Sequence, residues 1–69
     1  MHPTLRIRIN LQKLRAKLSQ EENRAMTEVE ILQWLADAGF KKEADGSWLV
    51  LEPDLGQLDP SEVDSVEDA

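Results

Sequence analysis

The chain of 69 residues contains few side chains that could carry out nucleophilic or acid–base catalysis. Nucleophilic catalysis needs a nucleophile, a base and a group that orients the base. His2 is the only histidine, and the chain has neither cysteine nor tyrosine. No candidate base stands beside any of the four serines, which are Ser19, Ser47, Ser61 and Ser65. Because so short a chain also leaves little room for a substrate pocket, we expect a protein that is not an enzyme.

Oxygen ligands for a metal ion are concentrated near the C-terminal end, at Asp54, Asp59, Glu62 and Asp64. Their spacing does not match a calcium-binding EF-hand loop, which needs ligands at its first, third and fifth positions and a glycine at its sixth. Acidic residues at the start of a helix are also favoured by the helix dipole. The sequence therefore predicts neither a metal site nor a cofactor.

The net charge of −6 is distributed unevenly, with 8 basic and 14 acidic side chains. Residues 1–24 carry six of the basic side chains and two of the acidic ones, whereas residues 25–69 carry two basic and twelve acidic side chains. Asymmetry of this kind indicates a charged interaction surface. It is equally consistent with a basic front that packs against the acidic back of the same molecule.

Composition also indicates where the protein works. The absence of cysteine favours a reducing, cytoplasmic environment. The start of the chain lacks the apolar core of a signal peptide. The longest unbroken apolar run is 48–51, far below the ~20 residues of a membrane-spanning helix, so we expect no membrane association.

Residues 4–11 alternate between apolar and polar side chains. Leu5, Ile7, Ile9 and Leu11 fall on one side of an extended chain, and the residues between them are polar. Alternation with a period of two predicts a half-buried β-strand.

The segment 12–38 has helical spacing of apolar residues. Ser19 with Glu22, and Thr27 with Glu30, each match the capping-box pattern of a helix start. The segment is thus either one bent helix or two helices with a break near 19 or 26. Gly39 is placed to end the last helix as a residue with positive φ.

Residues 40–51 are expected to form a hairpin. Asp45 and Gly46 match a two-residue type I′ turn, in which both central residues have positive φ. The arm 47–52 is apolar on both faces and is the predicted central strand, with the arm 40–44 on one side and the strand 4–10 on the other. Pro53 ends the strand because it cannot donate a ladder hydrogen bond.

The predicted fold class is α+β, with helices packed on one face of a small antiparallel sheet. Residues 1–53 form a single domain in this interpretation. Residues 54–69 form an acidic tail or a short helix, and Asp59, Pro60 and Glu62 supply a helix-start pattern.

The predicted function is a small regulatory or adaptor-like protein that binds another protein, with a basic surface on the partner. Tryptophan is enriched at the energetic centres of protein interfaces, although in a small domain it is also a natural core residue. A homodimer is a further possibility, through the apolar face of the helix at 27–38. The candidate partner-binding residues are Trp34, Trp48, Asp59, Glu62, Asp64, Glu67 and Asp68.

Two nucleic-acid alternatives remain open. A basic face could bind DNA or RNA; its candidate residues are Arg6, Arg8, Lys13, Arg15 and Lys17. Alternatively, the acidic residues could mimic nucleic acid and inhibit a basic protein. Two helices before a hairpin can look like a winged helix, whose last helix enters the major groove. Here that helix carries Glu28, Glu30 and Asp37 without any basic residue, which argues against phosphate contacts.

Overall fold

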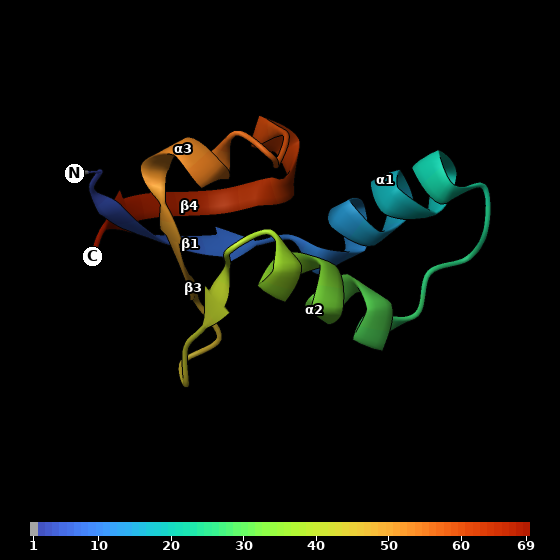
Figure 1. Cartoon of the computed structure of the whole chain (residues 1–69), viewed down its shortest axis with the longest axis horizontal. Coiled ribbons are helices and arrows are strands. Elements are labelled where there is room, and N and C mark those ends of the chain that lie inside the picture. The colour runs from blue at the N-terminus through green and yellow to red at the C-terminus, as the bar shows by residue number, and fades with distance from the viewer. Residues whose placement is uncertain (1) are drawn as a thin grey trace.

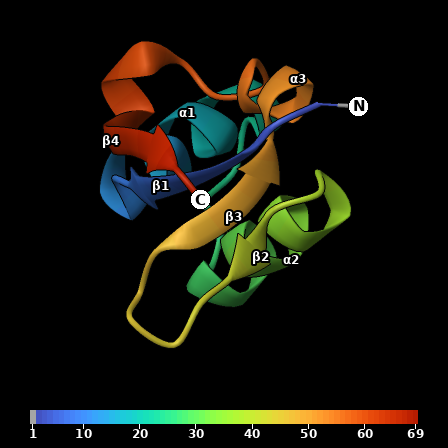
Figure 2. The same cartoon turned by 90° about the vertical axis from the view of Figure 1, so that its left-hand side faces the viewer.

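The alternating segment near the N-terminus forms a central strand of an antiparallel sheet. A computed structural model describes residues 2–69. In it, β1 (Thr4–Ile9) lies between β3 (Trp48–Leu51) and β4 (Val63–Asp68), and β2 (Lys41–Lys42) pairs with the far side of β3. All neighbours are antiparallel (Figures 1 and 2). The predicted α+β fold is confirmed, and the arm 47–52 does lie between the other two predicted strands.

The helical region consists of two helices, α1 (Leu11–Glu22) and α2 (Glu28–Asp37). α1 ends at Asn23, whose φ of 55° lies in the left-handed region that asparagine tolerates. The capping box at Thr27 and Glu30 is confirmed. The one at Ser19 was wrong, because α1 continues through Ser19, whose hydroxyl accepts the Met26 N–H at 3.0 Å.

Gly39 ends α2 as predicted, with a φ of 96°. The N–H of Phe40 donates to the carbonyl of Leu35 at 2.9 Å, and the N–H of Gly39 donates to that of Ala36 at 3.2 Å. This pair of bonds is the Schellman motif, which satisfies the last carbonyls of a helix and turns the chain. It directs the chain from α2 into β2.

The hairpin forms, but its turn differs from the predicted one. Gly46 has a φ of 88°, whereas Asp45 is not among the residues with positive φ. The N–H of Gly46 donates to Glu43 O at 3.1 Å, and the N–H of Glu43 donates to Ser47 O at 2.8 Å. The loop is therefore a three-residue connection with one positive-φ glycine, and the type I′ prediction was wrong. Asp45 instead uses its carboxylate to accept the Ser47 N–H at 2.9 Å.

The acidic tail is not confirmed, because most of residues 54–69 are ordered parts of the same fold. α3 (Glu52–Leu55) and a single 3₁₀ turn, η1 (Pro60–Glu62), lead into β4. Val63 lies opposite Ile9 and Val66 opposite Ile7, with Asp64 as an extra bulged residue. Because of the bulge, Val63 and Val66 lie on one face of the strand although they are three positions apart in the sequence. In the sequence alone, a spacing of three is typical of a helix.

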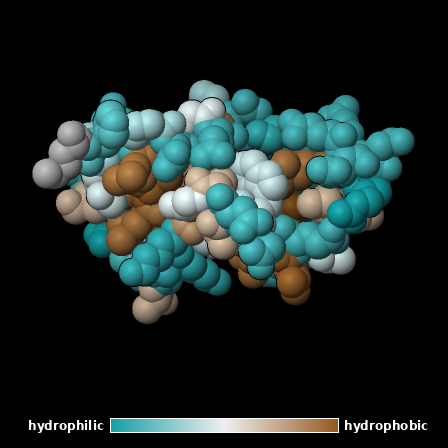
Figure 3. All heavy atoms as spheres, viewed as in Figure 1, coloured by the Kyte–Doolittle hydropathy of each residue, from teal (hydrophilic) through white to brown (hydrophobic). Residues whose placement is uncertain are grey.

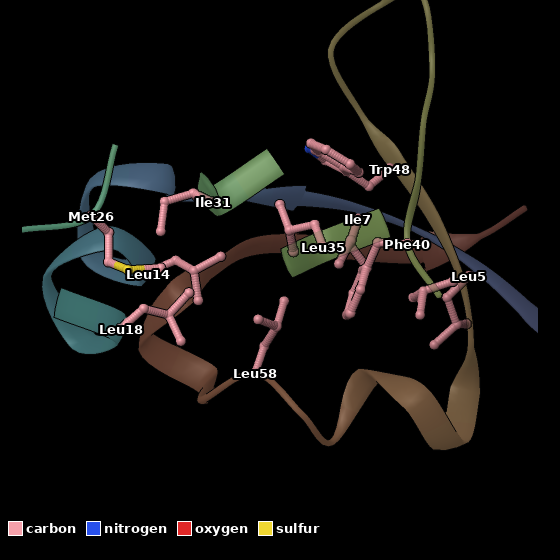
Figure 4. Close-up of a cluster of buried hydrophobic side chains, with 11 residues drawn as sticks. Leu5, Ile7, Leu14, Leu18, Met26, Ile31, Leu35, Phe40, Trp48 and Leu58 are labelled. Atoms are coloured by element: carbon pink, nitrogen blue, oxygen red, sulfur yellow. The ribbon is translucent and has the colours of Figure 1, made fainter. Parts of the chain in front are cut away.

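The core lies between one face of the sheet and the helices (Figure 4). Figure 2 shows α1 and α2 behind the sheet, α3 above it past the end of β3, and no helix in front of the strands. The buried hydrophobic residues come from β1, α1, α2 and β3 and from the segments between elements, and they include Ile7, Leu14, Ile31, Leu35, Trp48 and Leu58. Figure 3 shows a mainly hydrophilic exterior with small, separate apolar areas. None of the helices found in residues 2–69 is long and apolar enough to cross a bilayer.

Candidate functional site

The predicted basic residues do not form one continuous face. Arg6 and Arg8 alternate with the core residues of β1 and so belong to the uncovered face of the sheet, whereas Lys13, Arg15 and Lys17 belong to α1. The Arg8 guanidinium lies 3.9 Å from the carboxylate of Asp45, and both side chains are exposed. This pair joins the basic front of the chain to the hairpin and contributes little free energy in water.

Lys17 is the basic residue most completely neutralised within the fold. Its Nζ lies 3.0 Å from Glu62 Oε1 and 3.7 Å from Asp59 Oδ2. Burial lowers the pKa of Lys17, but the hydrogen bond and the charge of Glu62 outweigh it, so the pKa is raised above its ordinary value. Lys17 is therefore not available to bind a phosphate without losing these partners.

Two further arginines are held by local contacts. Arg15 Nε donates to the Met26 carbonyl at 2.7 Å, and Arg24 pairs with Glu30. Arg6 lies between Leu49 and Glu67 across the sheet, and its Nε is buried without a hydrogen-bond partner among the described residues. Three of the six basic residues of the front, Arg8, Lys17 and Arg24, thus pair with acidic residues from the back of the chain.

Three of the seven predicted partner-binding residues are already occupied. Trp48 is 4% exposed and packs in the core opposite Ile7. Glu62 is 2% exposed, and its Oε1 accepts the Asp59 N–H at 2.7 Å as well as Lys17 Nζ. Asp59 itself pairs with Lys17. Asp59 and Glu62 position η1 against α1 through Lys17. Trp48 and Glu62 are buried, so the structure offers no exposed group there for a partner to contact.

The outer face of α2 is the clearest accessible surface that contains a predicted residue. Trp34 is partly buried against the core, and the neighbouring Val29 is 75% exposed. A shallow hollow of about 400 Å³ is lined by Met26, Val29, Glu30, Gln33, Trp34 and Asp37. Val29 falls within the helical spacing of apolar residues over 12–38, and only the packed structure shows that it is exposed rather than buried.

A second hollow of about 230 Å³ lies between α1 and α2. Its lining is Leu11, Gln12, Arg15, Glu28, Ile31 and Leu32. Its lining contains one arginine and one glutamate but no nucleophile, so this hollow does not have the side chains of a nucleophilic catalytic site.

The remaining predicted residues, Asp64, Glu67 and Asp68, are exposed on β4 at the edge of the sheet. They lie on a different element from Trp34, which means that the structure does not gather the candidate residues into one site. Within residues 2–69, no three His, Cys, Asp or Glu side chains are grouped so as to hold a metal ion.

Comparison with family models, with curated proteins and with solved structures gives no match for this chain.

Proposed function

We propose that this protein is a small, non-enzymatic adaptor or regulatory protein that binds another protein through the outer face of α2. The observation that carries the proposal is the exposed Val29 beside the partly exposed indole of Trp34. A valine that is 75% exposed gains free energy when a partner covers it, at roughly 25 cal/mol per Å² of apolar surface. A neighbouring tryptophan supplies the kind of anchor on which interface energy concentrates.

Charge defines the partner further. Asp37 and Glu30 line the same hollow, and Glu28 begins the same helix. Arg24 offsets the charge of Glu30. Glu28 and Asp37 form no ion pair among the described residues, and their negative potential favours a partner with basic groups around an apolar patch and speeds association at low salt. The same charges oppose a phosphate backbone. The absence of cysteine supports a cytoplasmic setting for this interaction.

The test is a comparison of bound proteins from a lysate of the source cells, captured on wild-type protein and on Val29→Glu. Glutamate in the first turn of a helix is compatible with the helix dipole, so the variant should fold. We expect it to lose the partner. Leu51→Glu is the matched control, because Leu51 is also an exposed apolar residue but lies on β3. If wild type, Val29→Glu and Leu51→Glu recover the same partner equally, the binding surface is not on α2.

Fluorescence gives an independent reading of the same proposal. The two tryptophans differ in exposure, since Trp48 is in the core and Trp34 is not fully covered. A bound partner should therefore protect Trp34 from acrylamide quenching. In a Trp48→Phe variant, unchanged quenching on binding would show that the partner lies elsewhere.

A further inference from the structure

We propose that the free edge of β4 binds an extended, basic segment of a partner protein by adding it to the sheet as a further strand. This surface is separate from the α2 face, and the inference does not depend on it. β4 is an edge strand of six residues, whereas the opposite edge strand, β2, has only two. A longer edge offers more backbone groups to an incoming strand.

The register shows which backbone groups of β4 are free. The Ala69 N–H donates to the Thr4 carbonyl at 3.2 Å, which makes Thr4 with Ala69 a hydrogen-bonded pair of the ladder. Antiparallel pairs alternate between bonded and non-bonded. Continuing along the ladder, Arg6 with Glu67 is a hydrogen-bonded pair. The pairs that contain Val66 and Asp68 are non-hydrogen-bonded pairs. The N–H and C=O groups of Val66 and Asp68 therefore point away from β1, toward the free edge.

The opposite side of β1 supports this assignment. The Glu52 N–H donates to the Pro3 carbonyl at 3.0 Å, which makes Leu5 with Val50 a bonded pair across β1 and β3. Leu5 and Ile7 thus direct their backbone groups toward β3, and Arg6 directs its own toward β4. The two ladders agree, and among residues 2–69 no strand pairs with the outer side of β4.

The side chains of β4 specify the chemistry of the added strand. Asp64, Glu67 and Asp68 are exposed, and none forms an ion pair with another described residue. Glu67 lies on the uncovered face of the sheet with Arg6, whereas Val66 and Asp68 lie on the helix side with Ile7 and Leu5. A basic side chain in the added strand would meet a carboxylate on either face. Val66, which is 50% exposed, would gain an apolar neighbour.

A second copy of the chain is a poor occupant of this edge. Pairing β4 with itself places Asp64, Glu67 and Asp68 close to the same carboxylates of the other copy, in either strand direction. Like charges opposite each other destabilise a strand pair. Charge complementarity therefore selects a basic segment from another protein.

The edge is also distant from the surface used in the proposed function. Figure 2 shows α2 behind β2 and β3, with β4 at the other side of the sheet. Two partners could accordingly bind at once, one on each surface.

The test uses the full chain and a short, capped peptide of alternating lysine and valine as the probe. We expect the peptide to bind and to slow hydrogen exchange at the amides of Val66 and Asp68. Two control peptides separate strand addition from charge attraction. One replaces every lysine with glutamate, and the other keeps the lysines but is methylated at every backbone nitrogen. Neither should bind.

Variants of the protein provide a second, independent test. Val66→Pro removes an outward N–H that β1 does not use, a position at which edge strands tolerate proline. It should weaken peptide binding at least about tenfold, a change equivalent to about 1.4 kcal/mol. Val66→Thr, which keeps the N–H, and Val29→Glu on α2 should bind as wild type does.

Equal binding of the lysine peptide and its methylated form would overturn the proposal, because only charge would then be recognised. Unchanged exchange at Val66 and Asp68 would overturn it as well. If Val66→Pro does not fold, the methylated peptide still decides the question on the wild-type protein. Loss of peptide binding in Val29→Glu would instead place the peptide on α2 and contradict the β4 assignment.

Discussion

At the scale of single residues, Lys17 and Glu62 connect the basic and acidic halves of the chain. The Glu62 carboxylate is buried and is satisfied by the Lys17 ammonium and the Asp59 N–H. The backbone of Glu62 also helps to place the strands, since its carbonyl accepts the Asn10 N–H at 2.7 Å. Glu62 thus connects η1 to α1 through its carboxylate and to Asn10, at the start of α1, through its carbonyl.

Replacing Lys17 with methionine keeps the apolar stem and removes the charge. We expect the free energy of unfolding to fall by about 1–3 kcal/mol, because Glu62 is left buried with fewer partners. Urea unfolding measures this change. Adding Glu62→Gln should recover part of the loss, since the amide oxygen can still accept the Asp59 N–H. Lys13→Met, on an exposed part of α1, should change stability by no more than about 0.5 kcal/mol. Equal effects at Lys13 and Lys17 would contradict this role.

Glu30 supplies a prediction about pH. The hydrogen bond from Arg24, followed by the one from the Thr27 N–H, lowers the pKa of Glu30 from 4.5 to about 2. A lowered pKa means that the stabilisation is present above pH 4.5 and is lost as the pH falls toward 2. In Arg24→Gln, the pKa of Glu30 should rise toward its ordinary value. Carboxyl-carbon NMR titration checks this, with Lys13→Gln as a control that should leave Glu30 unchanged.

At the scale of elements, local sequence signals determined the two ends of α2 and the extent of β1. Thr27 begins α2, Gly39 ends it, and the alternation of 4–11 gives β1. These signals succeed because each acts through backbone groups a few residues away. β4 lacked such a signal, because the bulge at Asp64 changes the spacing of its apolar residues from two to three. The turn type was wrong for a related reason: Asp45 satisfies the Ser47 N–H with its side chain while keeping a negative φ.

Gly39 tests the end of α2. Any residue at position 39 would have to adopt a backbone φ of 96°, and its Cβ would lie 3.2 Å from Asp54 Oδ2. We expect Gly39→Ala to lower the free energy of unfolding by about 1–2 kcal/mol. Gly56→Ala is the matched control, since Gly56 has a φ of −62° and its Cβ would meet nothing closer than 3.6 Å. That substitution should be neutral or stabilise by up to about 1 kcal/mol. A lower unfolding midpoint for Gly56→Ala than for Gly39→Ala would contradict the requirement for glycine at the end of α2.

At the scale of the whole molecule, basic and acidic side chains occupy different surfaces. Basic groups are spread over the sheet face and α1, and several already have acidic partners. The exposed surfaces on α2 and β4 are acidic. The part of the molecule that the structure describes therefore has two exposed acidic surfaces and no continuous basic one.

Nucleic acid binding can be tested directly. We expect no gel shift of duplex DNA or single-stranded RNA at ~50 mM salt, where phosphate contacts are strongest. A gel shift that disappears in an Arg6→Gln, Arg8→Gln double variant would support the alternative that the basic residues bind nucleic acid.

The acids of β4 also make a prediction about assembly. Light scattering should find the wild-type protein monomeric. Neutralising β4 with Asp64→Asn, Glu67→Gln and Asp68→Asn removes the repulsion between two edges, so we expect association that rises with concentration. Adding Val66→Pro should restore the monomer. A neutralised protein that stays monomeric would show that charge is not what protects this edge.

The sequence by itself determined the α+β class, the order of the helices and the hairpin, and the ends of α2, because alternation, caps and glycine conformations act over short distances. It also indicated the scarcity of catalytic side chains. Only the tertiary structure decided that Trp48 and Glu62 are buried, that Val29 is exposed and that residues 63–68 complete the sheet. These outcomes depend on which faces meet across segments far apart in the chain, such as β1 with β4 and Lys17 with Glu62. The basic front and acidic back were visible as composition, but their pairing required the fold.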